Sequence, residues 1–247
     1  MMADACAAGK DVYVEKPAAN SIGEAAIMVA AAKKYNRLVQ VNQWQRSQKH
    51  FKDAIAYVQS GQLGTIAQTK TWMYNGHGIL PAISDAPVPA GVDYNMWLGP
   101  ASKRAFNPNR FHFNFRWFWD YAGGLMTDWG VHLINMVQMG MGLEAPKSVS
   151  SVGGKFVFDD DSETPDSQVT VYEFPTYQML WEHRAGLYNG LNGRAWGVQW
   201  TGTEGTIILN DQGYELIAER KKESLDSEKK PGSGNPHLAH VRNFLDC

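Results

Sequence analysis

A lysine that follows a predicted strand is the first residue whose position suggests chemistry. Lys16 stands in the tripeptide Glu15-Lys16-Pro17, directly after the apolar residues Val12 to Val14. Ligands of open α/β sheets bind beyond the carboxyl ends of the strands, so this lysine would point into such a crevice. Pro17 favours an extended backbone at Lys16, which aims the side chain. The alternative is a surface lysine in an ordinary loop, and the tripeptide alone leaves both interpretations open.

An aspartate and a histidine form the second candidate. Asp128 and His132 are four residues apart at the start of an amphipathic segment, residues 131–141. In a helix they would share a face, where a carboxylate and an imidazole can bind a hydroxylated substrate and move its proton. Equally, Asp128 could cap the helix while His132 is a hydrogen-bonded core histidine.

Aromatic side chains are concentrated between Tyr94 and Trp129, where 11 of 36 residues are Phe, Trp or Tyr. Flat rings with polar neighbours suit sugar faces and nicotinamide, which makes Arg116, Trp117 and Trp119 candidate substrate-binding residues. A subunit interface or a core is equally rich in aromatic residues. Interleaved arginines and rings also bind single-stranded nucleic acid, but a formal charge of −2 argues against that partner.

The elements that must position these residues change in kind along the chain. A strand at residues 11–14, a helix that starts with a Ser21–Glu24 capping box, and a strand at residues 38–41 form a βαβ unit of a parallel sheet. One such unit cannot bury its own sheet, so we expect a fragment truncated at the N-terminus. The amphipathic helix that begins at His237 stops at residue 247, and we expect truncation there too, with Leu238, Val241, Phe244 and Leu245 on its apolar face.

An amphipathic helix is predicted at residues 49–60, with Phe51, Ala54, Ile55 and Val58 on one face and Gly61 at its end. Alternation dominates after this helix. Strands are predicted at residues 65–74, 148–158, 168–174, 178–183, 196–201, 205–209 and 214–218. The predicted fold class is therefore α/β plus α+β: a remnant of a Rossmann parallel sheet (residues 1–45), then a domain with a large, mostly antiparallel open sheet (residues 46–247). We expect the aspartates at 159–161 to form a solvated loop rather than a metal site, and residues 219–235 to be a loop.

Composition excludes several classes. Hydrophobic residues make up 44% of the chain and charged residues 19%, which is typical of a globular protein. The two cysteines, Cys6 and Cys247, give neither a disulfide framework nor a zinc pattern. No apolar stretch is long enough to cross a membrane, and no signal peptide is visible. Localisation stays open: cytoplasmic by default, or periplasmic if a longer N-terminus carries an export signal.

Four segments in order resemble the Gfo/Idh/MocA oxidoreductases, relatives of glucose-fructose oxidoreductase and inositol dehydrogenase. They are residues 9–17 (GKDVYVEKP), 123–132 (GGLMTDWGVH), 202–207 (GTEGTI) and 240–247 (HVRNFLDC). The resemblance implies a Rossmann domain that binds NAD or NADP, with residues 15–17 at the cofactor and Lys16 as the catalytic lysine. It also implies that Asp128 and His132 are the catalytic aspartate–histidine pair. A sugar, cyclitol or related polyol would be the substrate, and the C-terminal sheet would form a homo-oligomer.

One departure from the family pattern concerns the cofactor. The Gly-x-Gly-x-x-Gly phosphate turn is absent from the 247 residues, and no acidic ribose ligand can be assigned. We therefore expect the parent protein to be a dehydrogenase and this chain alone to be inactive. Two alternatives remain: an NAD-dependent glycoside hydrolase of the same family, which recycles its cofactor, and a non-catalytic oligomerisation module.

Overall fold

The computed structural model describes residues 1–74, 78–219, 227–232 and 234–247. Its contacts divide the chain into two compact units. Unit 1 comprises Met1–Ile66, Ile134–Leu143 and Gln199–Cys247, and unit 2 comprises Ala67–Leu133 and Glu144–Val198. The division follows contacts rather than sequence order, and a domain boundary at residue 45 stays a prediction.

The expected βαβ unit lies in unit 1. Strand β1 (Val12–Val14) pairs in parallel with β2 (Val39–Val41), and helix α2 (Ile22–Lys34) connects them. Ser21 Oγ accepts a hydrogen bond from the Glu24 amide, as the capping box predicts. The Glu24 carboxylate accepts from the amide of Asn20 rather than from that of Ser21. The small parallel sheet is therefore confirmed. The second bond of the capping box is made to the amide of Asn20, one residue before the predicted partner Ser21.

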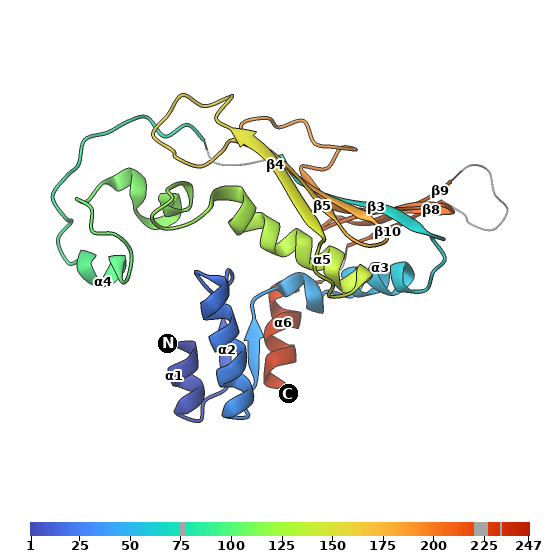
Figure 1. The fold of residues 1–247 in the computed structure, drawn as a ribbon, viewed down its shortest axis with the longest axis horizontal. Coiled ribbons are helices and arrows are strands. Elements are labelled where there is room, and N and C mark those ends of the chain that lie inside the picture. Colours follow the sequence, from blue (N-terminus) through green and yellow to red (C-terminus); the bar gives the residue numbers. More distant parts are fainter. Residues whose placement is uncertain (75–77, 220–226, 233) are drawn as a thin grey trace. The chain divides into compact units, whose positions relative to one another are not determined.

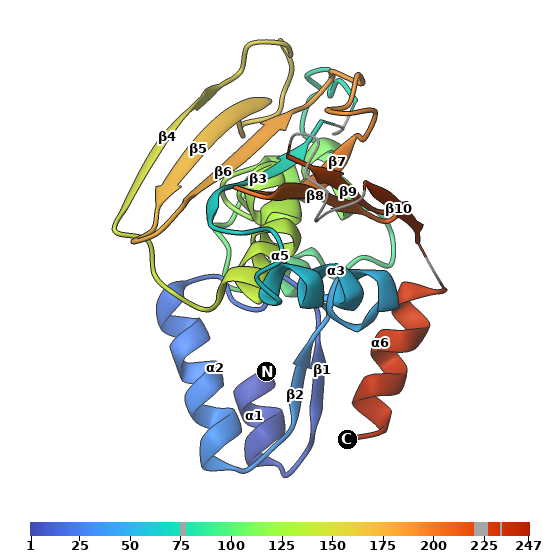
Figure 2. The ribbon, with the colours of Figure 1, turned by 90° about the vertical axis from the view of Figure 1, so that its right-hand side faces the viewer.

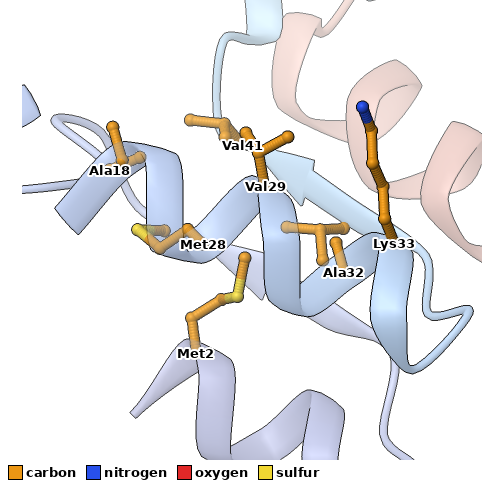
Figure 3. A pocket seen from close by; sticks show the side chains of 9 residues that line it. Met2, Ala18, Met28, Val29, Ala32, Lys33 and Val41 are labelled. Carbon is orange, nitrogen blue, oxygen red and sulfur yellow. The ribbon is translucent and has the colours of Figure 1, made fainter. Parts of the chain in front are cut away.

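Helices cover both sides of this small sheet. Helix α1 (Met2–Ala7) and α2 lie on one side of β1 and β2, and α6 (Pro236–Leu245) lies on the other (Figures 1 and 2). A groove between α1, α2 and β2 encloses about 370 Å³, and its lining is apolar apart from Lys33 (Figure 3). Lys16 is not among the residues that line it. The groove is therefore not treated as part of the candidate site.

Helix α6 packs through a different face from the one predicted. Its buried His240 bonds to the Val41 carbonyl through Nε2 (3.0 Å) and to Ser47 Oγ through Nδ1 (2.7 Å). The Tyr13 ring contacts both His240 and Phe244. The apolar side chains expected on the packed face are exposed, namely Leu238, Val241 and Leu245. The prediction is confirmed for Phe244. The helix nevertheless packs through the side that carries His240, because this residue bonds to the Val41 carbonyl and to the Ser47 hydroxyl.

Amphipathic helix α3 (Lys49–Gln59) forms as expected and packs on two strands of the large sheet. Its buried residues include Phe51, Ala54, Ile55 and Val58, which are the predicted apolar face. It follows the short helix η1 (Trp44–Ser47) and contacts β8 (Gly205–Asn210) and β9 (Gly213–Ala218) within unit 1. Gly61, just beyond the helix, has φ +78°, the left-handed conformation that ends helices.

The large sheet has eight strands in the order β10-β9-β8-β7-β3-β6-β5-β4. Besides β8 and β9, its strands are β3 (Ile66–Met73), β4 (Ser148–Gly154), β5 (Ser167–Glu173), β6 (Gln178–Arg184), β7 (Trp196–Gly202) and β10 (Glu228–Pro231). Four neighbouring pairs, β4–β5, β5–β6, β8–β9 and β9–β10, are antiparallel, whereas β3 and β6 run parallel. The prediction of a mostly antiparallel open sheet is confirmed.

One strand is shorter than predicted, and another strand forms where a loop was predicted. Strand β4 ends at Gly154 because the amides of Phe156, Val157 and Phe158 turn to donate to the Asp166 carboxylate at 2.8–3.1 Å. Strand β10 lies in the segment predicted as a loop, part of which, residues 220–226 and 233, is outside the described residues. This strand is exposed along its whole length, and an edge strand can be polar because only its backbone needs to pair.

Residues 159–161 form a loop with an exposed Asp159, as predicted, but the expectation of a solvated side chain is wrong for Asp160. The Asp160 side chain is fully buried, pairs with Lys155 at 2.9 Å and accepts hydrogen bonds from the Leu80 amide and from Ser162. Burial alone would raise the pKa of Asp160, but these bonds outweigh it and lower the pKa to about 2. Asp160 therefore organises the turn as a buried anion.

Unit 2 also contains the aromatic segment and the start of a long helix. Its short helices are α4 (Tyr94–Leu98), η2 (Pro108–Arg110) and η3 (His112–Trp117). A π-helical turn, η4 (Met126–Gly130), continues directly into α5 (Val131–Met141). No helix in the described parts of the chain is long and apolar enough to cross a membrane.

Candidate functional site

The Glu15-Lys16-Pro17 loop follows β1 at the carboxyl edge of the parallel pair. Lys16 is half-buried, whereas Glu15 and Pro17 are exposed, and the Lys16–Pro17 peptide is cis. Asn42, the first residue after β2, donates through Nδ2 to Glu15 at 2.8 Å. Its Oδ1 accepts from the Tyr13 hydroxyl at 2.7 Å. The asparagine side chain therefore ties the ends of both strands together and fixes the residue beside Lys16.

Asn42 was not among the residues singled out from the sequence. A signal was present, because it follows a predicted parallel strand and therefore lies at the same sheet edge as Lys16. Its neighbour Tyr13 has a raised pKa, first because the hydroxyl is partly buried and then because the Glu15 carboxylate is close. The phenol is thus held neutral, as the donor of the bond to Asn42.

Asp128 lies inside the π-helical turn, and the same helical run continues through His132. Thr127 braces this turn, because its Oγ1 accepts from the Gly123 amide at 3.0 Å and donates to the Gly124 carbonyl at 3.3 Å. Single π turns occur frequently at functional sites, where they shift a side chain out of the regular helical positions.

Asp128 has a charged neighbour that the sequence did not pair with it. The Nε atom of Arg116 lies 3.3 Å from the Asp128 carboxylate. The same guanidinium lies over the Phe113 ring, 4.2 Å from its centroid, and donates through Nη1 to the Phe113 carbonyl at 3.0 Å. The structure thus brings one predicted substrate-binding residue to one predicted catalytic residue.

His132 is buried beside the indole ring of Trp129. The Trp129 ring stands edge-on to the imidazole with centroids 6.1 Å apart, and Trp196 contacts Trp129 at 5.3 Å. The neighbouring Gly124 has φ +62°, and a Cβ there would come within 2.7 Å of the Thr164 side chain. The Gly123-Gly124 pair therefore allows the close packing that the turn before Asp128 requires.

The two tryptophans proposed for substrate binding are in different environments. Trp117 is buried, with 3% of its surface exposed, whereas Trp119 exposes 58%. The Trp119 backbone amide donates to Glu163, which also pairs with Arg104, so the exposed ring is presented from an anchored backbone. The three candidates of this segment are thus not uniformly exposed, and Trp119 offers the most accessible ring.

Other rings of this segment pack on one another. Trp97 stacks on Tyr94 at 5.7 Å and contacts Phe111 and Tyr121 at 5.0 and 5.3 Å. These rings are half-buried, and their edge and stacked contacts favour packing within the segment. Burial raises the pKa of Tyr121 to about 12, with a further contribution from the nearby Tyr94 hydroxyl. Lys16 belongs to unit 1 and the Asp128–His132 pair to unit 2, so their convergence stays a prediction.

Comparisons with known proteins agree with this fold. Residues 58–155 match the model of the oxidoreductase family, C-terminal alpha/beta domain (GFO_IDH_MocA_C2). The oxidoreductase YrbE of Bacillus subtilis, itself uncharacterized, is 23% identical over 249 residues, which cover 92% of this chain and 61% of YrbE. This chain therefore spans less than two thirds of that curated relative.

Solved structures share the architecture. The aldose-aldose oxidoreductase of Caulobacter crescentus, complexed with glycerol, has a TM-score of 0.67 at 22% identity, covering all of this chain and 64% of that one. An inositol dehydrogenase homolog of Azotobacter vinelandii, complexed with NADH and myo-inositol, has a TM-score of 0.65 at 17% identity. That match covers 93% of this chain and 52% of the homolog. The fold shared with these structures is a small parallel α/β part with a large open sheet. Residues 58–155 are similar to the C-terminal domain of the Gfo/Idh/MocA oxidoreductases.

Proposed function

We propose that this chain is the substrate-domain part of a nicotinamide-dependent dehydrogenase that oxidises a sugar, cyclitol or related polyol. The observation that carries the proposal is the placement of Asp128 and His132 in one continuous helical run, braced by Thr127 and flanked by Arg116 and indole rings. A carboxylate, an imidazole and flat rings suit the binding and deprotonation of a hydroxylated ring. The NADH and myo-inositol of the Azotobacter homolog support the same class of reaction.

The cofactor residues would be Glu15, Lys16 and Pro17. They follow a strand of the parallel pair, and Asn42 fixes Glu15 beside the half-buried Lys16. A nicotinamide dinucleotide, NAD or NADP, would supply a hydride acceptor there. These residues fit only the nicotinamide side of such a molecule, since a Gly-rich phosphate turn is not in the sequence. Tight dinucleotide binding therefore requires more than these 247 residues.

Side chains of this protein would remove the proton from the substrate hydroxyl. Oxidation of an alcohol needs a proton acceptor beside the carbon that loses hydride. Histidine and lysine side chains are common proton acceptors in such reactions, so His132 and Lys16 are the candidates for this role. Asp128 would accept a hydrogen bond from a substrate hydroxyl and hold it toward the acceptor.

A homo-oligomer through the open sheet is part of the proposal. Val152 of β4 is directly opposite Val169 of β5, and these side chains are 77% and 43% exposed. Directly opposite residues point to the same face of an antiparallel pair. An exposed apolar strip of this kind on a sheet face is typical of a surface that is covered by a partner.

The test is turnover with both dinucleotides by the protein as its gene encodes it. We expect reduced nicotinamide to accumulate with one or more members of a panel of inositols, aldoses and sugar alcohols. It should not accumulate in the control without an added substrate. Release of sugar from a glycoside without net reduction of NAD would instead identify the glycoside hydrolase. If the protein shows no dinucleotide binding and no turnover, the proposal is overturned and the non-catalytic module is the remaining alternative.

A further inference from the structure

We infer that Arg116 is a positioning residue, which orients the Asp128 carboxylate instead of binding substrate directly. The inference deepens the proposed function and rests on it for the role of Asp128. It changes the interpretation of Arg116, because the sequence placed this residue among the groups that contact the substrate.

Three contacts hold the guanidinium in one place. Its Nη1 donates to the Phe113 carbonyl at 3.0 Å, and its central carbon lies 4.2 Å from the Phe113 ring centroid and 5.1 Å from that of Phe115. Helix η3 carries all three residues, so the arginine is fixed by its own turn. A planar guanidinium that is stacked and hydrogen-bonded loses little further entropy when it pairs with a carboxylate.

The contact with Asp128 is ionic and leaves the carboxylate able to accept. Arg116 Nε lies 3.3 Å from one carboxylate oxygen without the alignment of a hydrogen bond, and both side chains are largely buried, with 24% and 15% exposed. A carboxylate has about four lone-pair positions, so an ion pair at one oxygen does not exhaust its capacity. The ion pair with Arg116 is therefore compatible with a hydrogen bond from a substrate hydroxyl to this carboxylate.

The location of Asp128 makes such support necessary. The residue lies in a π-helical turn, where the main chain is less regular than in an α-helix, and Thr127 braces only the start of the turn. The Arg116 guanidinium, which η3 holds in place, adds a fixed positive charge beside the carboxylate. Loss of this restraint would let Asp128 take other rotamers and misplace the bound hydroxyl.

The test is a double-mutant cycle in the intact protein with a substrate found in the turnover screen. We expect Arg116→Met to lower kcat/KM by ~10- to 100-fold, as misplacement of a reacting group does. In an Asp128→Asn background, the same change should have less than a ~2-fold effect, because there is no charged carboxylate to orient. Arg116→Lys should recover part of the loss. Arg242→Met, which removes an exposed arginine paired with Asp246 on α6, is the control.

Two outcomes would overturn the inference. An equal loss in both backgrounds would make Arg116 a direct ligand or a purely structural residue. Additive effects of the two substitutions on urea unfolding would show that the ion pair has no energetic coupling. Unfolding needs no substrate, so a coupled pair in a protein without turnover would contradict the proposed function and not the pairing itself.

Discussion

Trp181 donates a hydrogen bond from its indole nitrogen to Nδ1 of His183, two residues further along β6, at 3.2 Å. Both side chains are fully buried. The opposite ring nitrogen of His183 lies 3.1 Å from the Pro165 carbonyl, which can only accept. Nε2 therefore carries the proton and Nδ1 has the free lone pair, so both bonds require a neutral imidazole.

Acid should weaken the fold through this histidine. Burial lowers the pKa of His183 below its usual value, and the Pro165 bond and the Asp166 charge oppose it only in part. The unfolded chain then binds more protons than the folded one as pH falls below ~6.5, so this stability is present above that pH and is lost below it. Burial lowers the pKa of His50 and His240 as well, which adds to the same trend.

Urea unfolding between pH 8 and pH 5 measures the effect. We expect the free energy of unfolding to fall toward pH 5, and His183→Gln to flatten that slope. If this variant does not fold, His240→Asn gives the same test in unit 1. The exposed His112, replaced by Asn, should leave the slope unchanged. A slope that is identical in all variants would contradict the prediction.

Replacement of Lys16 by Met should remove the proposed proton acceptor and keep a long side chain. We expect kcat to fall by ~10²–10⁴ in the protein as its gene encodes it. Dinucleotide affinity should change little, because Lys16 is proposed to act at the nicotinamide ring and not at the phosphates. The free energy of unfolding should change by under ~0.5 kcal/mol, because the residue lies in a loop. Lys10→Met, at an exposed position, is the control, and near-normal turnover by Lys16→Met would refute the assigned role.

His132→Asn should lower kcat and weaken its pH dependence near neutrality, because the proposed imidazole proton acceptor is removed. The double variant with Lys16→Met should lose less than the product of the two single losses if both act in one proton transfer. Steady-state kinetics from pH 6 to pH 9 measure both effects. His112→Asn serves as the control in the same unit, at a left-handed backbone position that Asn tolerates. Multiplicative losses would assign the two residues to separate steps.

Lys16, Asp128 and His132 should lie within about 10 Å of a common point, since each must reach one substrate carbon directly or through one water. A cysteine pair at positions 16 and 132, in a Cys247→Ser background, tests this with a short bis-maleimide. Cys6 is buried, so it should not compete. We expect rapid intramolecular cross-linking, while a pair at 10 and 132 should react more slowly. Absence of any cross-link at 16 and 132 would end the shared-site hypothesis.

The sheet face that carries Val152 should form the oligomer. A charge there, as in Val152→Arg, should shift the mass measured by light scattering toward the monomer. Val149 is also exposed and lies on the same strand, but it alternates to the other face, so Val149→Arg is a matched control. A monomeric parent protein, or equal effects of both substitutions, would contradict the proposed interface.

The sequence alone determined the elements and the order of the motifs. The parallel pair, the apolar face of α3 and the helix limits at Ser21 and Gly61 depend on capping, periodicity and glycine, which act within a few residues. Tertiary structure decided which polar groups are buried and what they meet. Asp160 accepts from Leu80, α6 turns His240 toward β2, and Arg116 pairs with Asp128 across twelve residues. Such pairs depend on desolvation and on groups distant in sequence, and a local pattern carries no information about either.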